Sequence, residues 1–121
     1  SDMEKIRLFL STLRKKGFRF ALDDFGSGYN SFHYLRELEF DFVKIDGAFI
    51  RGIEHSKTDE ALVRNLARLC HDLGIQTVAE FVESQSLLEH LRALGVTHAQ
   101  GYYIGLPRPD ILLFADKTVG R

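Results

Sequence analysis

The sequence has little cysteine, no long apolar run and no surplus of positive charge, and each shortage excludes a class of protein. Its 121 residues contain one cysteine, so no internal disulfide can form. No stretch approaches the ~18 apolar residues of a membrane-spanning helix, and the N-terminus lacks a signal-peptide pattern. The net charge of -1 leaves no basic surplus for a nucleic-acid polymer or an acidic membrane surface. We therefore expect a cytoplasmic location, with no nucleic-acid polymer as partner and no direct membrane insertion.

The residues that are present suit one modest globular unit in which helices and strands alternate. Hydrophobic residues make up 45% of the chain and charged residues 27%. We predict helices at 3–16, 31–39, 58–73 and 84–94, strands at 18–23, 42–45, 75–79 and 97–99, a last helical segment at 110–115, and a loosely ordered tail at 116–121. Alternation of this kind predicts an α/β fold with parallel strands and helices outside.

Every predicted strand ends in a side chain that can do chemistry. These residues are, in chain order, Asp23, Asp24, Lys44, Asp46, Glu80 and Gln100. Because functional sites of parallel α/β folds form at the carboxyl ends of the strands, we expect these residues to converge on one site.

The first strand delivers two adjacent carboxylates, Asp23 and Asp24, to a loop that contains Gly26 and Gly28. Adjacent carboxylates repel one another, so a cation near them is expected, and this arrangement is typical of a hard-metal site. The alternative is a simple turn between strand and helix with acidic capping residues. Strand alternation sends the two side chains in different directions, so that they bracket one metal ion or belong to two neighbouring ions.

Oxygen ligands favour Mg²⁺ or Mn²⁺, and the five histidines show no zinc spacing. Lys44 lies inside a short apolar strand, where it either reaches solvent or holds charge and orients water beside the carboxylates. The hypothesis from the residues alone is metal-assisted hydrolysis of a phosphate ester.

Four motifs along the chain occur together in a known family. They are residues 23–31 (DDFGSGYNS), 44–46 (KID), 78–83 (VAEFVE) and 100–105 (QGYYIG) followed by Pro107. From about Phe9 to Pro109 the chain resembles the EAL-domain family, which are bacterial signal-transduction phosphodiesterases of cyclic di-GMP. Three positions depart from the usual pattern of the family, namely Ser27, Asn30 and Phe81. At the position of Phe81 the family commonly has a glycine.

The resemblance implies a TIM-type (β/α)8 barrel that hydrolyses cyclic di-GMP to linear pGpG with two Mg²⁺ or Mn²⁺ ions. Carried over by motif, Asp23 and Asp24 are metal ligands, Lys44 orients the attacking water, and Glu80 is a metal ligand or the general base. The other implied roles are substrate binding for Gln100 and Gly101, support of the glycine loop for Glu83, and a dimer interface for Tyr29 and Phe32.

Part of the family pattern does not occur in this sequence. None of the predicted strands carries the family's Glu-Ala-Leu motif, because the Glu-Ala-Leu at 60–62 falls in the helix predicted at 58–73. The Asn and Glu of the two strands after that motif, which also bind metal in the family, are missing too. A complete barrel needs about 250 residues. We therefore expect residues 1–121 to be a single partial EAL domain, a truncated domain with the last four β/α units of the barrel.

A partial barrel exposes two sheet edges and an apolar inner face. We therefore expect the isolated chain to be inactive or nearly so, and to self-associate, with two halves forming a pseudo-barrel.

Two other functions are alternatives to a phosphodiesterase. One is a non-catalytic EAL-like module for nucleotide sensing or dimerisation. The other is a phosphoacceptor receiver domain, which also uses an acidic pair and a lysine at strand ends. Receivers place that lysine on the last strand, whereas Lys44 is on the strand directly after the acidic pair.

Overall fold

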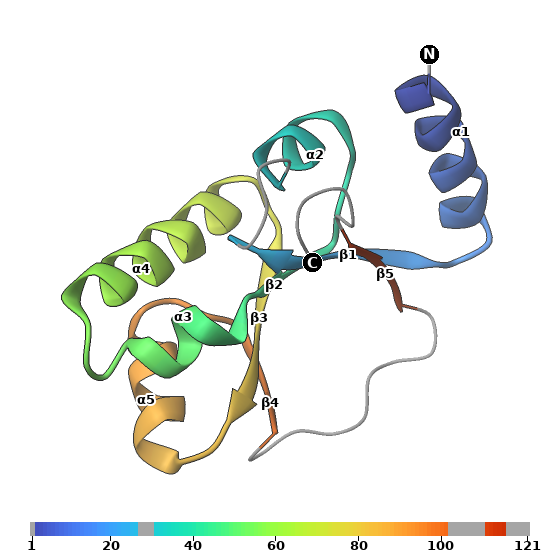
Figure 1. The fold of residues 1–121 in the computed structure, drawn as a ribbon. Coiled ribbons are helices and arrows are strands. Elements are labelled where there is room, and N and C mark those ends of the chain that lie inside the picture. The colour runs from blue at the N-terminus through green and yellow to red at the C-terminus, as the bar shows by residue number, and fades with distance from the viewer. Residues whose placement is uncertain (1, 27–30, 102–110, 116–121) are drawn as a thin grey trace.

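The computed structural model describes residues 2–26, 31–101 and 111–115 (Figure 1). In chain order its elements are α1 (Asp2–Lys15), β1 (Arg19–Phe25), α2 (Ser31–Glu37), β2 (Phe42–Ile45), α3 (Gly47–Gly52), α4 (Lys57–Asp72), β3 (Gln76–Val82), α5 (Gln85–Ala93), β4 (His98–Gly101) and β5 (Ile111–Ala115). The four predicted helices up to residue 94 and the four predicted strands are confirmed, with ends that differ by a few residues. None of the helices within the described ranges has the length and apolar character needed to cross a bilayer.

The five strands form one sheet in the order β4-β3-β2-β1-β5. All four pairings are parallel, as expected for strands that are joined by helical crossovers. In Figure 1, α3, α4 and α5 gather on the same side of β2, β3 and β4. The α/β fold with parallel strands and outer helices therefore holds.

Two elements differ from the sequence prediction. Residues 111–115 form the strand β5, where the sequence predicted a helical segment. These residues are a strand because their backbone pairs with the edge of β1, and a pattern of five residues does not indicate such a distant partner. The short helix α3 was not predicted, although its cap is visible in the sequence: the Asp46 carboxylate accepts a hydrogen bond from the Ala48 N–H at 2.9 Å. The predicted loose tail at 116–121 lies outside the described residues.

The main core lies between the outer face of the sheet and the helices. One cluster joins β2 and β3 to α3, α4 and α5, and a second joins β1 and β2 to α1, α2 and α4. On α4 the core-facing residues are Val63, Ala67 and Cys70, whereas Leu62 and Leu73 are 50% and 54% exposed. The buried stripe of this helix therefore follows the spacing of 63, 67 and 70.

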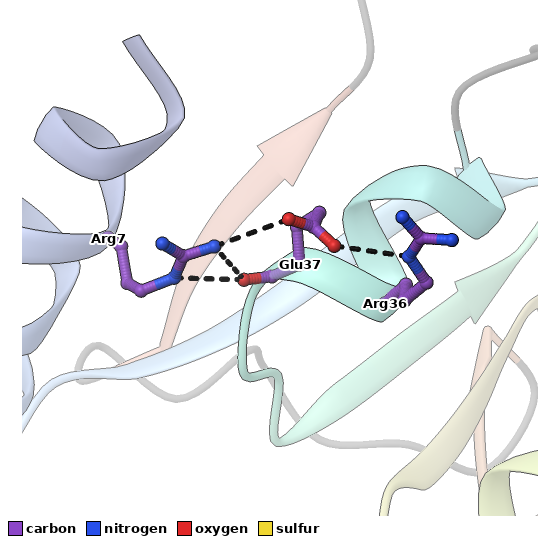
Figure 2. Close-up of polar contacts among 3 residues, drawn as sticks. All are labelled: Arg7, Arg36 and Glu37. Atoms are coloured by element: carbon purple, nitrogen blue, oxygen red, sulfur yellow. Dashed lines mark hydrogen bonds and ion pairs between the residues drawn. The ribbon is translucent and has the colours of Figure 1, made fainter. Parts of the chain in front are cut away.

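Helix α1 packs on the second core cluster through half-buried apolar residues and adds arginine contacts to them. No side chain of this described helix is fully buried, and Phe9 is 63% exposed. Figure 2 shows Arg7 donating to the Glu37 backbone oxygen at 3.2 and 3.1 Å and reaching its carboxylate, which also accepts from Arg36. The hydrogen bond from Arg36 lowers the pKa of the Glu37 carboxyl below its ordinary value. These contacts join α1 to the end of α2.

The inner face of the sheet carries a small cluster of buried residues, Ala21, Phe42 and Val78, one from each of three strands. The Arg19 guanidinium lies over the Phe42 ring, 5.3 Å from its centroid, at a distance typical of a cation–π contact. His98 meets the same ring edge-on at 5.6 Å. Charged and aromatic side chains therefore line the face that a closed barrel would enclose.

Candidate metal and phosphodiester site

Three neighbouring strands bring their polar ends together on the inner face. Asp23 ends the regular part of β1, Lys44 lies near the end of β2, and Glu80 lies in β3. Register places Lys44 beside Val78, two residues before Glu80, so alternation puts Lys44 and Glu80 on the same face. The convergence of strand ends that the sequence predicted is therefore present for these three residues.

Lys44 is the centre of the charged cluster. Its Nζ lies 3.6 Å from Asp23 Oδ1 and forms a close ion pair with Glu80 Oε1. The Lys44 side chain is only 12% exposed, and its two partners are 19% and 23% exposed. The alternative in which this lysine extends into solvent therefore does not hold. Because the groups are largely shielded from water, their interactions exceed those of a surface pair.

Asp24 joins the cluster through a bulge rather than through regular strand geometry. Its φ is 54°, and the pairing of β1 with β2 shifts register between Leu22 and Phe25. The Asp24 N–H donates to Asp23 Oδ1 at 2.9 Å. The two side chains were expected to leave in different directions, but oxygens of Asp23, Asp24 and Glu80 lie within 4.8 Å of one another. Left-handed backbone costs a non-glycine residue about 1–2 kcal/mol, so the surrounding structure must stabilise this conformation.

The cluster fits a hard divalent cation by its charge and donors. Three carboxylates and one ammonium carry a formal net charge of -2, and each carboxylate can supply an oxygen ligand. Ligands on opposite sides of Mg²⁺ lie about 4.2 Å apart, from metal–oxygen distances of about 2.1 Å. Oxygens of the three carboxylates lie within 4.8 Å of one another, so all three are close enough to hold one ion of this size.

A second bulge follows Glu80, and sequence reasoning did not anticipate it. Phe81 has φ 59°, and the pairing of β3 with β4 shifts register between Ala79 and Val82. The sequence held a signal, because Phe81 stands where the resembled family commonly has a glycine. Its ring is 60% exposed and lies over Gly47, where an added Cβ would meet Phe81 Cδ2 at 3.3 Å. Both acidic strand ends are thus followed by left-handed backbone.

The remaining predicted site residues are Gln100, Gly101, Glu83, Tyr29 and Phe32. Gln100 is half-buried in β4, and Gly101 is the last residue of that strand and pairs with Val82. Glu83 is exposed. Its predicted contact with the glycine loop involves residues 27–30, which lie outside the described residues, as does Tyr29.

Phe32 is 65% exposed at the start of α2, and its ring contacts Phe25 edge-on at 5.0 Å. It borders an apolar groove of about 410 Å³ between α2, α3 and α4. Other residues of this groove include Phe49, Leu62 and Leu66. The groove lies on the helical side of the sheet, away from the carboxylate cluster.

Comparison with known proteins identifies one family. The sequence profile described as EAL domain matches residues 1–107. The chain is 52% identical over 100 residues to the cyclic di-GMP phosphodiesterase PdeB of Shewanella oneidensis, a match that covers 83% of this chain and 12% of that protein.

Solved structures agree with this match. An EAL domain protein of Listeria monocytogenes aligns with TM-score 0.76 at 39% identity, over 85% of this chain and 42% of that one. BlrP1 of Klebsiella pneumoniae, in a complex with manganese and cyclic di-GMP, aligns with TM-score 0.73 at 38% identity, over 80% and 25% respectively. The chain therefore spans less than half the length of these relatives.

Proposed function

The chain belongs to the EAL domain family, and we propose that it carries part of the active site of a cyclic di-GMP phosphodiesterase. The observation that carries the proposal is the cluster of Asp23, Asp24 and Glu80 around Lys44 at the carboxyl ends of parallel strands. The manganese and cyclic di-GMP complex of a 38% identical structure supports the substrate and the divalent ion.

Each residue of the cluster has a role in this proposal. Asp23, Asp24 and Glu80 hold Mg²⁺ or Mn²⁺, which when bound polarises a phosphoryl oxygen and lowers the pKa of bound water. Lys44, fixed between Asp23 and Glu80, orients the attacking water and offsets developing negative charge. Glu80 serves as a ligand or as the general base. Gln100 and Gly101, at the end of β4, contact the substrate, which is opened to linear pGpG.

The proposal assigns activity to a complete domain and not to this chain alone. In this proposal, residues 1–107 supply the last four β/α units of the barrel. The family's other metal ligands belong to strands that the 121 residues do not contain. The isolated chain is therefore inactive or nearly so, although its carboxylates retain part of the metal site.

We further propose that the chain self-associates and that Tyr29 and Phe32 belong to the contact. The exposed Phe32 ring and the apolar groove beside it support this surface. The proposed location is the cytoplasm, where cyclic di-GMP would be encountered as a signalling nucleotide.

Calorimetric titration with cyclic di-GMP tests the proposed site directly. Ca²⁺ replaces Mg²⁺, because a hard cation with oxygen ligands fills the site while turnover is suppressed. We expect binding that depends on Ca²⁺ and is lost in Asp24→Asn. The matched control is Asp72→Asn, at an exposed residue of α4. Binding that is unchanged in Asp24→Asn would contradict the assignment of this carboxylate.

A second function, a non-catalytic nucleotide-sensing module, predicts a different pair of results. Cyclic di-GMP would then bind to the chain, yet a longer protein with all barrel strands would not release pGpG in Mn²⁺. The Lys44–Glu80 ion pair favours the phosphodiesterase, because an ammonium held between carboxylates can stabilise the negative charge that develops on a phosphodiester during hydrolysis.

A further inference from the structure

The outer edge of β1 is occupied by a strand from the end of the chain. Ile111–Ala115 pairs in parallel with Arg19–Asp23 over five consecutive positions, from Arg19↔Ile111 to Asp23↔Ala115. β5 is thus the last strand of the sheet on that side, with β2 on the opposite side of β1. This pairing covers backbone groups of β1 that would otherwise form an open edge.

The position of β5 is unexpected in a member of this family. The EAL domain match ends at residue 107, so residues 111–115 lie beyond it. A TIM-type barrel closes its sheet, and every strand then has a neighbour on both sides. In a closed barrel, the edge of β1 opposite β2 belongs to another barrel strand. β5 and that strand cannot occupy the same edge.

We propose that the edge of β1 is a strand-accepting surface and that β5 is its exchangeable occupant. Another parallel strand, contributed by a complementary part of the barrel, takes this edge when β5 leaves it. Because Ala115 pairs with Asp23, replacing β5 by another strand changes the backbone partner of a proposed metal ligand. Pairing of β5 and closure of the barrel around the site are therefore mutually exclusive.

The chain that connects β4 to β5 decides how well another strand competes with β5 for the edge of β1. β5 is linked to β4 by residues 102–110, and a short link of this kind gives an effective concentration in the millimolar range. A single free strand competes poorly with such a tethered one. A barrel segment of several strands competes better than a single strand, because it adds contacts beyond the edge of β1 itself.

Variants of the full chain test whether the edge accepts a strand. Leu113→Pro removes a backbone donor from β5 and disfavours its pairing, whereas Leu113→Val keeps the donor and serves as the matched control. In the double variant Ala21→Cys/Leu113→Cys, oxidation joins two register partners and holds β5 in place. The native Cys70 is buried on α4, which limits mispairing.

The probe is a labelled peptide with the sequence of residues 109–121, and binding is followed by fluorescence anisotropy. We expect Leu113→Pro to bind it at least about tenfold more tightly than the unaltered chain or Leu113→Val, a difference of about 1.4 kcal/mol. The oxidised double variant does not bind it, and reduction restores the binding of the unaltered chain. Hydrogen exchange of residues 19–25 rises in Leu113→Pro and falls again with peptide.

The proposal is overturned if the peptide binds all variants equally, or if it fails to bind Leu113→Pro. Unchanged exchange of residues 19–25 in Leu113→Pro overturns it as well, because β5 then does not protect that edge. None of these readouts depends on metal or cyclic di-GMP, so they are independent of the proposed catalytic function.

Discussion

At the scale of single residues, the account depends most on Lys44. Its ammonium separates two carboxylates that are largely shielded from water. We predict that Lys44→Met lowers the free energy of unfolding by about 1–3 kcal/mol at pH 7, because Asp23 and Glu80 lose their counter-charge. Urea denaturation measures this, and added Mn²⁺ should recover part of the loss. Lys5→Met, at an exposed position on α1, is the control. Equal stability of Lys44→Met and the unaltered chain would contradict the cluster.

Cys70 provides a pH-dependent test of the packing of α4. Burial raises the pKa of its thiol to about 11, whereas the unfolded thiol ionises near its ordinary value of about 8.5. The folded state favours the neutral thiol, so its contribution to stability is fully present below about pH 8.5 and is lost as pH rises toward 11. At pH 9 we expect a thiol reagent to label the unfolded chain rapidly and the folded chain slowly. Rapid labelling of the folded chain would show that Cys70 is accessible.

Some features of the site residues were predictable from the sequence and others were not. The carboxyl ends of parallel strands meet at one edge, so Asp23, Lys44 and Glu80 were predicted to converge from their places in the chain. The bulges at Asp24 and Phe81 were not predicted, because they depend on pairing with neighbouring strands. That pairing turns Asp24 toward the cluster, against the alternation of a regular strand.

At the scale of elements, Arg14 is the main polar attachment of α1. Its guanidinium donates to both oxygens of Asp41 at 3.2 and 3.0 Å and to the Glu39 carbonyl at 3.0 Å. It also lies 5.1 Å from the Phe20 ring centroid. Asp41 in turn accepts from the Phe20 N–H at 2.8 Å, so one arginine links helix, loop and strand.

We predict that Arg14→Lys destabilises the chain by about 1–2 kcal/mol, because lysine cannot reproduce the forked contact. Thermal denaturation measures the effect. Arg64→Lys is the matched control, since Arg64 forms only an exposed pair with Glu60 at 3.4 Å within α4. Equal effects of the two substitutions would show that the fork contributes no more than a surface ion pair.

Elements also differ in how well their sequences specify them. Helices α4 and α5 were predicted because their apolar spacing is a local signal. The structure adds their serine caps, in which Ser56 accepts from the Asp59 N–H and Ser84 from the Leu87 N–H. β5 was assigned as helix, because its identity as a strand depends on an edge of β1 that lies far away in the sequence. Local patterns cannot report such a partner.

At the scale of the whole molecule, the apolar groove beside α2 should contribute to self-association. We predict that Phe32→Glu weakens association in sedimentation velocity by about tenfold, because it places a charge in a buried contact. Phe9→Glu is the control, since Phe9 is 63% exposed on α1 and Phe32 is 65% exposed at the groove. A chain that stays monomeric at high concentration, or equal effects of both substitutions, would contradict this interface.

The central claim is that Asp23, Asp24 and Glu80 form part of a divalent metal site, and Mn²⁺ binding tests it most directly. Electron paramagnetic resonance counts the free ion as the chain is titrated. We predict binding that weakens by at least about tenfold in Asp23→Asn and in Glu80→Gln. Glu89→Gln, at an exposed residue of α5, should leave binding unchanged. Equal Mn²⁺ affinity in all four proteins would contradict the site.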